Sequence, residues 1–118
     1  MYPERLLEHF RNPRNVGDLP APAVTVEASN PACGDILRLA ARFDGGVVVE
    51  ARYKVRGCTA AIAAGSALSE WMVGKSRAEL AAFDPVIVDE ALGGLPPASR
   101  HAAALCAAGI RLLLARSG

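Results

Sequence analysis

Residues 33–58 read CGDILRLAARFDGGVVVEARYKVRGC, and their pattern predicts a β-hairpin. Apolar and polar residues alternate on both sides of Asp44-Gly45-Gly46, a sequence typical of a tight turn. Each strand would therefore have one apolar and one polar face, as in an antiparallel sheet that is covered on one side. The residues expected on the apolar face are Leu37, Leu39, Ala41 and Phe43 in the first strand and Val49, Ala51, Tyr53 and Val55 in the second.

Before the hairpin, the chain predicts one helix and one further extended segment. Pro3 fits the first turn of a short helix that runs to about Arg11. Val24 and Val26 alternate with polar residues in an extended segment over residues 23–28.

After the hairpin, the sequence predicts helices. Thr59 is expected to cap a helix over residues 60–73, and Ser76 with Glu79 fits a capping box. Pro85 and Pro97 are each expected at the start of a further helix, the last ending near residue 115. This order predicts a single α+β domain over residues 1–118, with the helices packed on one face of the sheet.

Composition and charge exclude several classes of protein. The 118 residues are 52% hydrophobic and 21% charged, which is typical of a globular domain, and the net charge of +1 gives no general attraction to nucleic acid or to an anionic membrane. No apolar run approaches the roughly 20 residues of a membrane span, and the N-terminus shows no signal sequence. Three cysteines, an odd number, indicate a reducing compartment, and we expect a cytoplasmic protein.

Four side chains of metal-binding type lie near the ends of these predicted elements: Cys33, Asp35, Cys58 and His101. An antiparallel hairpin brings the start of its first strand beside the end of its second, so Cys33 and Asp35 should lie near Cys58. Two thiolates, a carboxylate and an imidazole make a four-ligand set for zinc or an iron–sulfur cluster.

The surroundings of the candidate ligands bear on their roles, and Cys106 and His101 have alternative interpretations. Cys58 precedes a predicted helix, whose N-terminal amides would favour the thiolate. Cys106 lies in an alanine-rich helix, where a cysteine is usually a buried small hydrophobe, so it is a weak candidate. A histidine such as His101 can equally be a surface or capping residue.

Motifs over nearly the whole chain resemble the iron–sulfur scaffold family of IscU, SufU and the N-terminal domain of NifU. They lie in the order and spacing of that family, and the chain lacks the SufU insertion, so it is more similar to IscU. The motifs are residues 2–9, Asn12-Pro13-Arg14-Asn15-Val16-Gly17, Asn30-Pro31-Ala32-Cys33-Gly34-Asp35, Gly57-Cys58-Thr59-Ala60-Ala61-Ile62-Ala63, Gly74-Lys75-Ser76, Leu95-Pro96-Pro97 and His101.

The resemblance implies a fold and a role. The fold would be a three-stranded antiparallel sheet with helices packed against it. The role would be that of a scaffold or carrier rather than a turnover enzyme: it accepts sulfur from a cysteine desulfurase, assembles a 2Fe–2S cluster and passes it to apo-proteins. Zinc often occupies the same site. By resemblance, Cys33 and Cys58 would be ligands and sulfur acceptors, Asp35 a ligand or a group that keeps the cluster labile, and His101 a further ligand.

The chain departs from the family pattern at two places. IscU-like chains carry a third cysteine directly after the histidine, where this chain has Ala102. That cysteine is a candidate recipient of the incoming persulfide. The family's Hsp70-type chaperone motif continues with Val and Lys after Leu-Pro-Pro, whereas this chain has Ala98-Ser99, which calls chaperone recognition into question.

Two other functions stay open on the same fold. A zinc-bound structural or regulatory domain would use the same ligands, because two thiolates, one imidazole and one carboxylate complete a tetrahedral zinc site. A SufE-like sulfur acceptor would need only one reactive cysteine and no metal.

Overall fold

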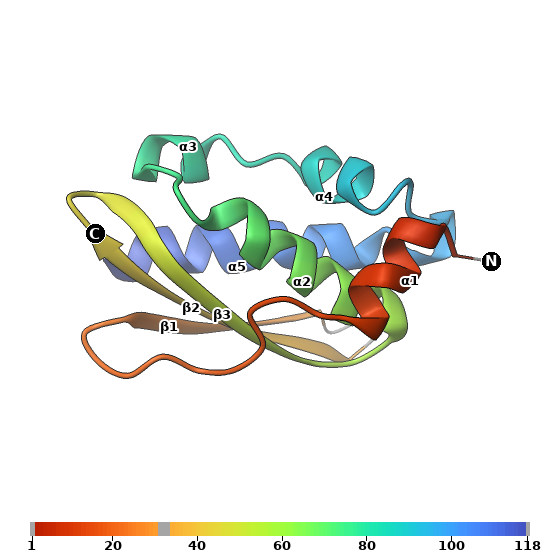
Figure 1. The fold of residues 1–118 in the computed structure, drawn as a ribbon, viewed down its shortest axis with the longest axis horizontal. Coiled ribbons are helices and arrows are strands. Elements are labelled where there is room, and N and C mark those ends of the chain that lie inside the picture. The colour runs from red at the N-terminus through yellow and green to blue at the C-terminus, as the bar shows by residue number, and fades with distance from the viewer. Residues whose placement is uncertain (1, 31–33, 118) are drawn as a thin grey trace.

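The computed structural model describes residues 2–30 and 34–117. Within these residues, three strands form one antiparallel sheet in the order β1-β2-β3, and the helices cover one of its faces (Figure 1). This arrangement confirms the predicted α+β fold. The strands are β1 (Val24–Asn30), β2 (Asp35–Asp44) and β3 (Val47–Arg56), and the helices are α1 (Glu4–Arg11), α2 (Thr59–Met72), α3 (Arg77–Ala81), α4 (Pro85–Ala91), a short 3-10 helix η1 (Pro97–Ser99) and α5 (His101–Ser117).

The predicted hairpin turns at Gly45 and Gly46. Both have positive φ, 61° and 80°, which a tight turn between right-twisted strands requires and which glycine adopts without strain. From this turn β2 and β3 run to the opposite end of the sheet, where Ile36 is paired with Arg56. The residues just outside this last pair are therefore neighbours in space.

A β-bulge interrupts the hairpin near its turn. Arg42 pairs with Glu50, whereas Phe43 pairs with Val48, so Val49 has no partner in the ladder. Val48 is buried and Val49 is 38% exposed. The predicted placement of Val49 on the apolar face is wrong, because the extra residue of a bulge reverses the alternation of side chains on the turn side of it.

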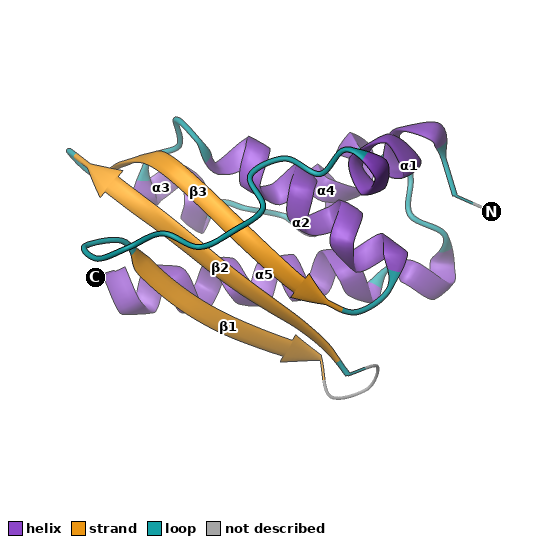
Figure 2. Ribbon diagram, turned by 60° about the horizontal axis from the view of Figure 1, so that its bottom comes forward, coloured by secondary structure: helices purple, strands orange, loops and turns teal. Residues whose placement is uncertain are grey.

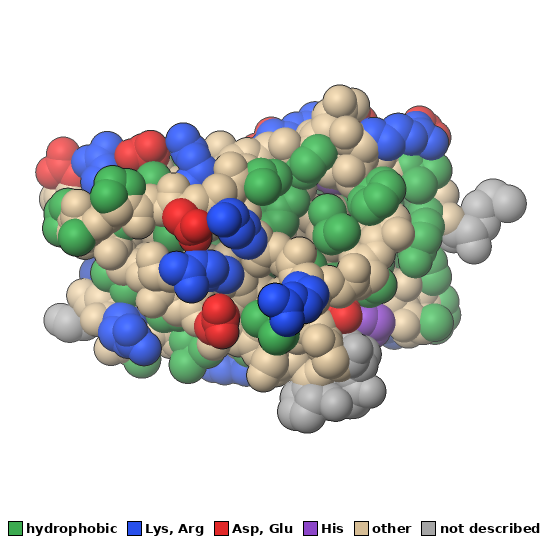
Figure 3. Space-filling view, turned by 90° about the horizontal axis from the view of Figure 1, so that it is seen from below, with side chains coloured by type: hydrophobic (Ala, Val, Ile, Leu, Met, Phe, Trp, Pro, Cys, Tyr) green, Lys and Arg blue, Asp and Glu red, His purple; other side chains and the backbone are tan. Residues whose placement is uncertain are grey.

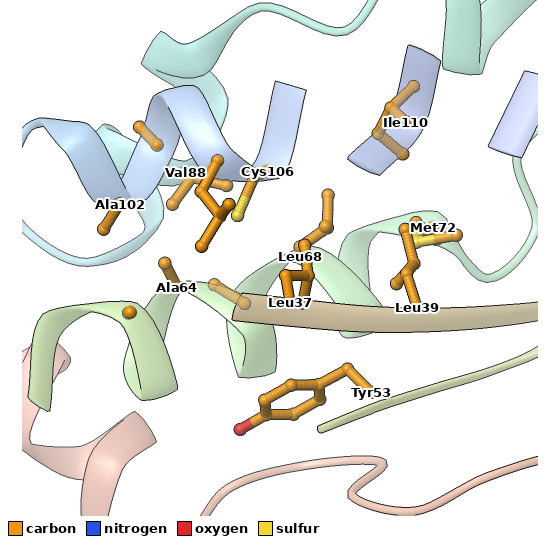
Figure 4. Packing of buried hydrophobic residues seen from close by; sticks show 14 of the residues in the cluster. Leu37, Leu39, Tyr53, Ala64, Leu68, Met72, Val88, Ala102, Cys106 and Ile110 are labelled. Atoms are coloured by element: carbon orange, nitrogen blue, oxygen red, sulfur yellow. The ribbon is translucent and has the colours of Figure 1, made fainter. Parts of the chain in front are cut away.

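Small residues let α2 approach the sheet closely. A Cβ on Gly65 would lie only 2.4 Å from the Tyr53 ring, so the ring packs directly against the helix backbone. The buried Tyr53 hydroxyl donates a hydrogen bond to the Ile62 carbonyl of the same helix, at 2.8 Å. Leucine, alanine and other apolar side chains from the sheet, α2 and α5 fill the remaining core (Figure 4). Within the described residues, no helix has the length and apolar character needed to cross a bilayer.

Two helix starts differ from the prediction by a few residues. The N-cap of α2 is Cys58 and Thr59 is its first helical residue, so the prediction that Thr59 caps this helix is wrong by one position. Residues 97–99 form the separate 3-10 turn, in which the Ser99 amide donates to the Pro96 carbonyl, and α5 begins only at His101. The predicted capping box is confirmed, with Ser76 and Glu79 each accepting a hydrogen bond from the other's backbone amide.

The segment after α1 runs along the outer edge of β3. The Tyr53 amide donates to the Asn15 carbonyl and the Gly17 amide donates to the Tyr53 carbonyl, both at 2.9 Å. Val16 thereby forms a parallel bridge with Tyr53. From there the chain crosses the face of the sheet opposite the helices to reach β1 (Figure 2).

A buried polar cluster fixes α1 and this segment to α2. Ser66 Oγ lies 2.8 Å from His9 Nδ1 and accepts a hydrogen bond from the Arg14 amide at 2.9 Å. Ser69 Oγ donates to the Ser66 carbonyl at 2.8 Å and receives a longer bond from Asn15. We call His9, Arg14, Ser66 and Ser69 the α1–α2 cluster.

Candidate metal centre

Three side chains of metal-binding type meet where the hairpin ends and two helices begin. Asp35 is the first residue of β2, Cys58 is the N-cap of α2, and His101 is the first residue of α5. One ligand atom from each lies within 4.8 Å of the other two. The predicted approach of Asp35 and Cys58 across the hairpin is therefore present. Cys33, also predicted as a ligand and sulfur acceptor, lies outside the described residues, two positions before Asp35.

The separations of the three ligand atoms suit one tetrahedral ion. Cys58 Sγ lies 3.4 Å from Asp35 Oδ2 and 3.7 Å from His101 Nε2, and the last two atoms are 3.3 Å apart. Tetrahedral zinc, with bonds of about 2.0–2.3 Å to oxygen, nitrogen and sulfur, would give S–O, S–N and O–N separations of about 3.5, 3.6 and 3.3 Å. The geometry and the donor set thus both fit a single ion, with one further position for a fourth ligand.

The centre is buried on one side and open on the other. The Asp35 side chain is 7% exposed, whereas the His101 side chain is 28% exposed. Figure 3 shows acidic and histidine atoms side by side on one face of the molecule. A metal ion or a partner's side chain can therefore approach along the histidine side.

Burial raises the pKa of the Cys58 thiol, and the nearby Asp35 carboxylate adds to the effect. Hydrogen bonds from the backbone amides of Ala61 and Ala60, in the first turn of α2, act in the opposite direction. The predicted effect of the helix N-terminus is thus present, although desolvation outweighs it and the pKa of the Cys58 thiol is raised overall. A bound cation would supply the missing positive charge and displace the thiol proton.

Cys106 and Ala102 belong to the apolar core (Figure 4). Cys106 is 2% exposed, and burial raises the pKa of its thiol to about 12. The group of possible ligands found among the described residues does not include it. Ala102, which follows His101 in sequence, is fully buried.

Sequence reasoning missed one residue of the site, Gly57. It lies between the last residue of β3 and Cys58, and its Cα approaches the Asp35 carboxylate closely. The sequence signals for it were its position directly before Cys58 and its place in the Gly57-Cys58-Thr59 motif that carries the resemblance.

The sequence matches the family described as the NifU-like N terminal domain over residues 1–115. It is 45% identical over 106 residues to the bifunctional protein NifU/MnmA of Rubrobacter xylanophilus, a match that covers 88% of this chain but only 22% of that protein. It is 36% identical to the iron-sulfur cluster assembly scaffold protein IscU of Escherichia coli K12, covering 97% of this chain and 91% of that protein.

The fold has a close counterpart among solved structures. A putative iron-sulfur cluster assembly scaffold protein for the SUF system, from Fervidobacterium islandicum AW-1, superposes with a TM-score of 0.79. The alignment covers 96% of each chain at 19% sequence identity, so this likeness supports the fold alone.

Proposed function

The chain belongs to the NifU-like N-terminal domain family, and from this premise we propose that it is an iron–sulfur cluster assembly scaffold or carrier. In this role it accepts sulfur from a cysteine desulfurase, binds iron or zinc, and hands a 2Fe–2S cluster to apo-proteins. One observation carries the proposal: Asp35, Cys58 and His101 converge with the separations that a tetrahedral ion needs. The sequence relationship to IscU over most of both chains supports it.

The proposed ligand set is Cys33, Asp35, Cys58 and His101. The last three are in contact, and Cys33 is two residues from Asp35, which suits it for the fourth position. Nitrogen and oxygen ligands can replace thiolates in an iron–sulfur site, at the cost of altered potential and stability. The set therefore favours a cluster that is released readily over one that is held permanently.

Sulfur would arrive as a persulfide on the desulfurase. The thiolate of Cys58 or Cys33 attacks the outer sulfur, the sulfur–sulfur bond breaks, and the desulfurase thiolate leaves. The acceptor cysteine then carries the persulfide, and two electrons from a reductant release sulfide to iron. Because thiols and labile clusters need a reducing compartment, we place this activity in the cytoplasm.

A zinc-bound structural or regulatory domain is the second candidate. It is favoured by the match to tetrahedral separations and by Ala102 in place of a third thiol. It predicts stoichiometric zinc, a large loss of melting temperature on chelation and no transfer of a cluster.

The test compares purified wild-type protein with Cys33→Ala, Cys58→Ala and, as a matched control, Cys106→Ala. Each protein is prepared anaerobically, its iron, zinc and sulfide contents are measured, and it is reconstituted with iron, cysteine, a desulfurase and a thiol reductant. Charge-transfer absorption in the wild type and in Cys106→Ala, lost in the other two variants, is the expected result. Cluster transfer is then followed with an apo-ferredoxin.

The opposite outcomes are equally clear. Zinc alone in every preparation, with no absorption after reconstitution, would support the zinc domain. A persulfide on one cysteine, detected by mass spectrometry in metal-free protein that never forms a cluster, would instead support a SufE-like sulfur acceptor.

A further inference from the structure

The backbone conformation at position 57 does not explain why this residue is a glycine. The glycines of the described residues that adopt positive φ include Gly34, Gly45 and Gly74, but not Gly57. An L-amino acid could therefore adopt the backbone of residue 57, so the reason for glycine there is space.

The space that Gly57 leaves is filled by the Asp35 carboxylate. A Cβ at position 57 would lie 2.5 Å from Asp35 Oδ1, 2.6 Å from Cγ and 3.1 Å from Cβ. These distances are shorter than the 3.4 Å at which ordinary contact begins, and the opposing atoms belong to a short side chain that is 7% exposed. The carboxylate would have to move by about 1 Å, a misplacement large enough to matter at a reacting site.

The movement would act directly on the candidate centre. While Oδ1 faces Gly57, Oδ2 lies 3.4 Å from Cys58 Sγ and 3.3 Å from His101 Nε2. The same carboxylate is therefore held between the glycine on one side and the two other ligands on the other. Displacing it from the glycine changes both of these distances together.

We infer that Gly57 is a positioning residue that holds the Asp35 carboxylate in register with Cys58 and His101. The inference rests on the proposed function for its biological meaning, since it concerns the site that would hold the metal. The glycine touches no metal itself and acts only through Asp35. Its effect on the centre should therefore disappear when Asp35 has no carboxylate.

A double-mutant cycle tests this inference with Zn²⁺ and Co²⁺ as probes. The proteins are wild type, Gly57→Ala, Asp35→Ala and the double variant, and zinc affinity is measured by competition with a chromophoric chelator. Gly57→Ala should weaken zinc binding by about 10–100-fold, the range seen when a group that orients a ligand is lost. In the Asp35→Ala background the same change should alter affinity less than twofold. The visible absorption of bound Co²⁺ should shift in Gly57→Ala and be the same in the two Asp35→Ala proteins.

Thermal unfolding of the metal-free proteins gives an independent readout. Gly57→Ala should lower the melting temperature by roughly 5–15 °C, because of overpacking against Asp35, and Asp35→Ala should restore most of this loss. If Gly57→Ala does not fold, the double variant should fold. Equal losses in both backgrounds, or a double variant that also fails to fold, would overturn the inference, as would an unchanged affinity and Co²⁺ spectrum in Gly57→Ala.

This test is separate from that of the proposed function. A wild-type protein that binds Zn²⁺ but never assembles a cluster would refute the scaffold proposal. The double-mutant cycle on Gly57 and Asp35 would still test the inference. A wild-type protein that binds neither probe would remove the metal role of Gly57, and unfolding would then test only its contact with Asp35.

Discussion

The molecule contains two polar clusters with one histidine each, and they differ in how complete they are. In the α1–α2 cluster the principal contacts are 2.8–2.9 Å long, the length of ordinary hydrogen bonds. At the candidate metal centre the contacts are 3.3–3.7 Å and join sulfur, nitrogen and oxygen. In the first cluster the polar groups are joined by direct hydrogen bonds. In the second they have the spacing of ligands around a central ion. The donor types and the shortest contacts thus separate a cluster joined by direct hydrogen bonds from a group of side chains whose spacing suits a bound ion.

Replacing the histidine of the metal centre should have the largest effect. His101→Ala removes one of the three converging candidate ligands, so zinc affinity should fall by more than about 100-fold, beyond the range for loss of an outer partner. The free energy of unfolding of the metal-free protein should change by less than about 0.5 kcal/mol, as for other partly exposed sites. Zinc competition titration and urea unfolding measure the two quantities. A variant that loses stability but keeps its zinc affinity would contradict the distinction between the clusters.

Ser66→Ala should give the opposite result. It leaves the buried His9 ring and the Arg14 amide without their shared partner, which should cost about 1–3 kcal/mol of unfolding free energy. Zinc affinity should stay within twofold of wild type, because the α1–α2 cluster contributes no ligand. Urea unfolding and zinc titration check both parts, and a parallel loss of zinc affinity would show that the two clusters are coupled.

Gly65→Ala sharpens the comparison with Gly57→Ala. Both glycines are crowded, but Gly65 faces the Tyr53 ring in the core. The added methyl group should overpack the core at a cost of about 1–3 kcal/mol, reduced by the roughly 1 kcal/mol that alanine gains over glycine in a helix. Unfolding experiments should therefore show a net loss of about 1 kcal/mol with unchanged zinc affinity. Restoration of the lost stability by Asp35→Ala would contradict this account, because the three atoms nearest to a Cβ at position 65 belong to Tyr53 and not to Asp35.

The smallest expected effect is a pH dependence of stability from His9. Burial, followed by the charge of Arg14, lowers the pKa of His9 from its ordinary value of 6.5. As pH falls through 6.5 the unfolded chain takes up a proton before the folded one does, so the free energy of unfolding decreases. The decrease should level off below the folded-state pKa.

Urea unfolding of metal-free wild type and His9→Gln between pH 7.5 and 5 measures this effect. His101 is present in both proteins, so its contribution cancels in the difference. A wild type whose stability falls no more steeply than that of the variant would show that His9 does not contribute.

The sequence predicted much of this fold because its local signals were strong. The Gly45-Gly46 turn and the alternation around it established the hairpin, and the hairpin alone placed Asp35 near Cys58. His101 could not be placed by the same reasoning, since its approach depends on how α5 packs against the sheet. Its residue type and its place at the start of a predicted helix made it a candidate, and the family resemblance supported it.

The remaining differences between the predicted and the observed structure arise where the sequence shows no periodic pattern. Three consecutive valines, residues 47–49, give no alternation, so the bulge that exposes Val49 could not be seen. The α1–α2 cluster joins residues more than 50 positions apart in the sequence. Serines inside a helix carry no sequence pattern that predicts such distant hydrogen-bond partners. The role of Gly57 could be recognised only from the position of the Asp35 carboxylate in the three-dimensional structure.

The strip formed by Asn15, Val16 and Gly17 bears on the aggregation of the protein through a sheet edge. By taking up the backbone groups of Tyr53, it occupies the border of β3 that another chain would otherwise extend. Removal of the first 17 residues would expose the backbone groups of Tyr53, to which a strand of another chain can then pair. The N-terminal segment thus closes this part of the β3 edge to pairing with another chain.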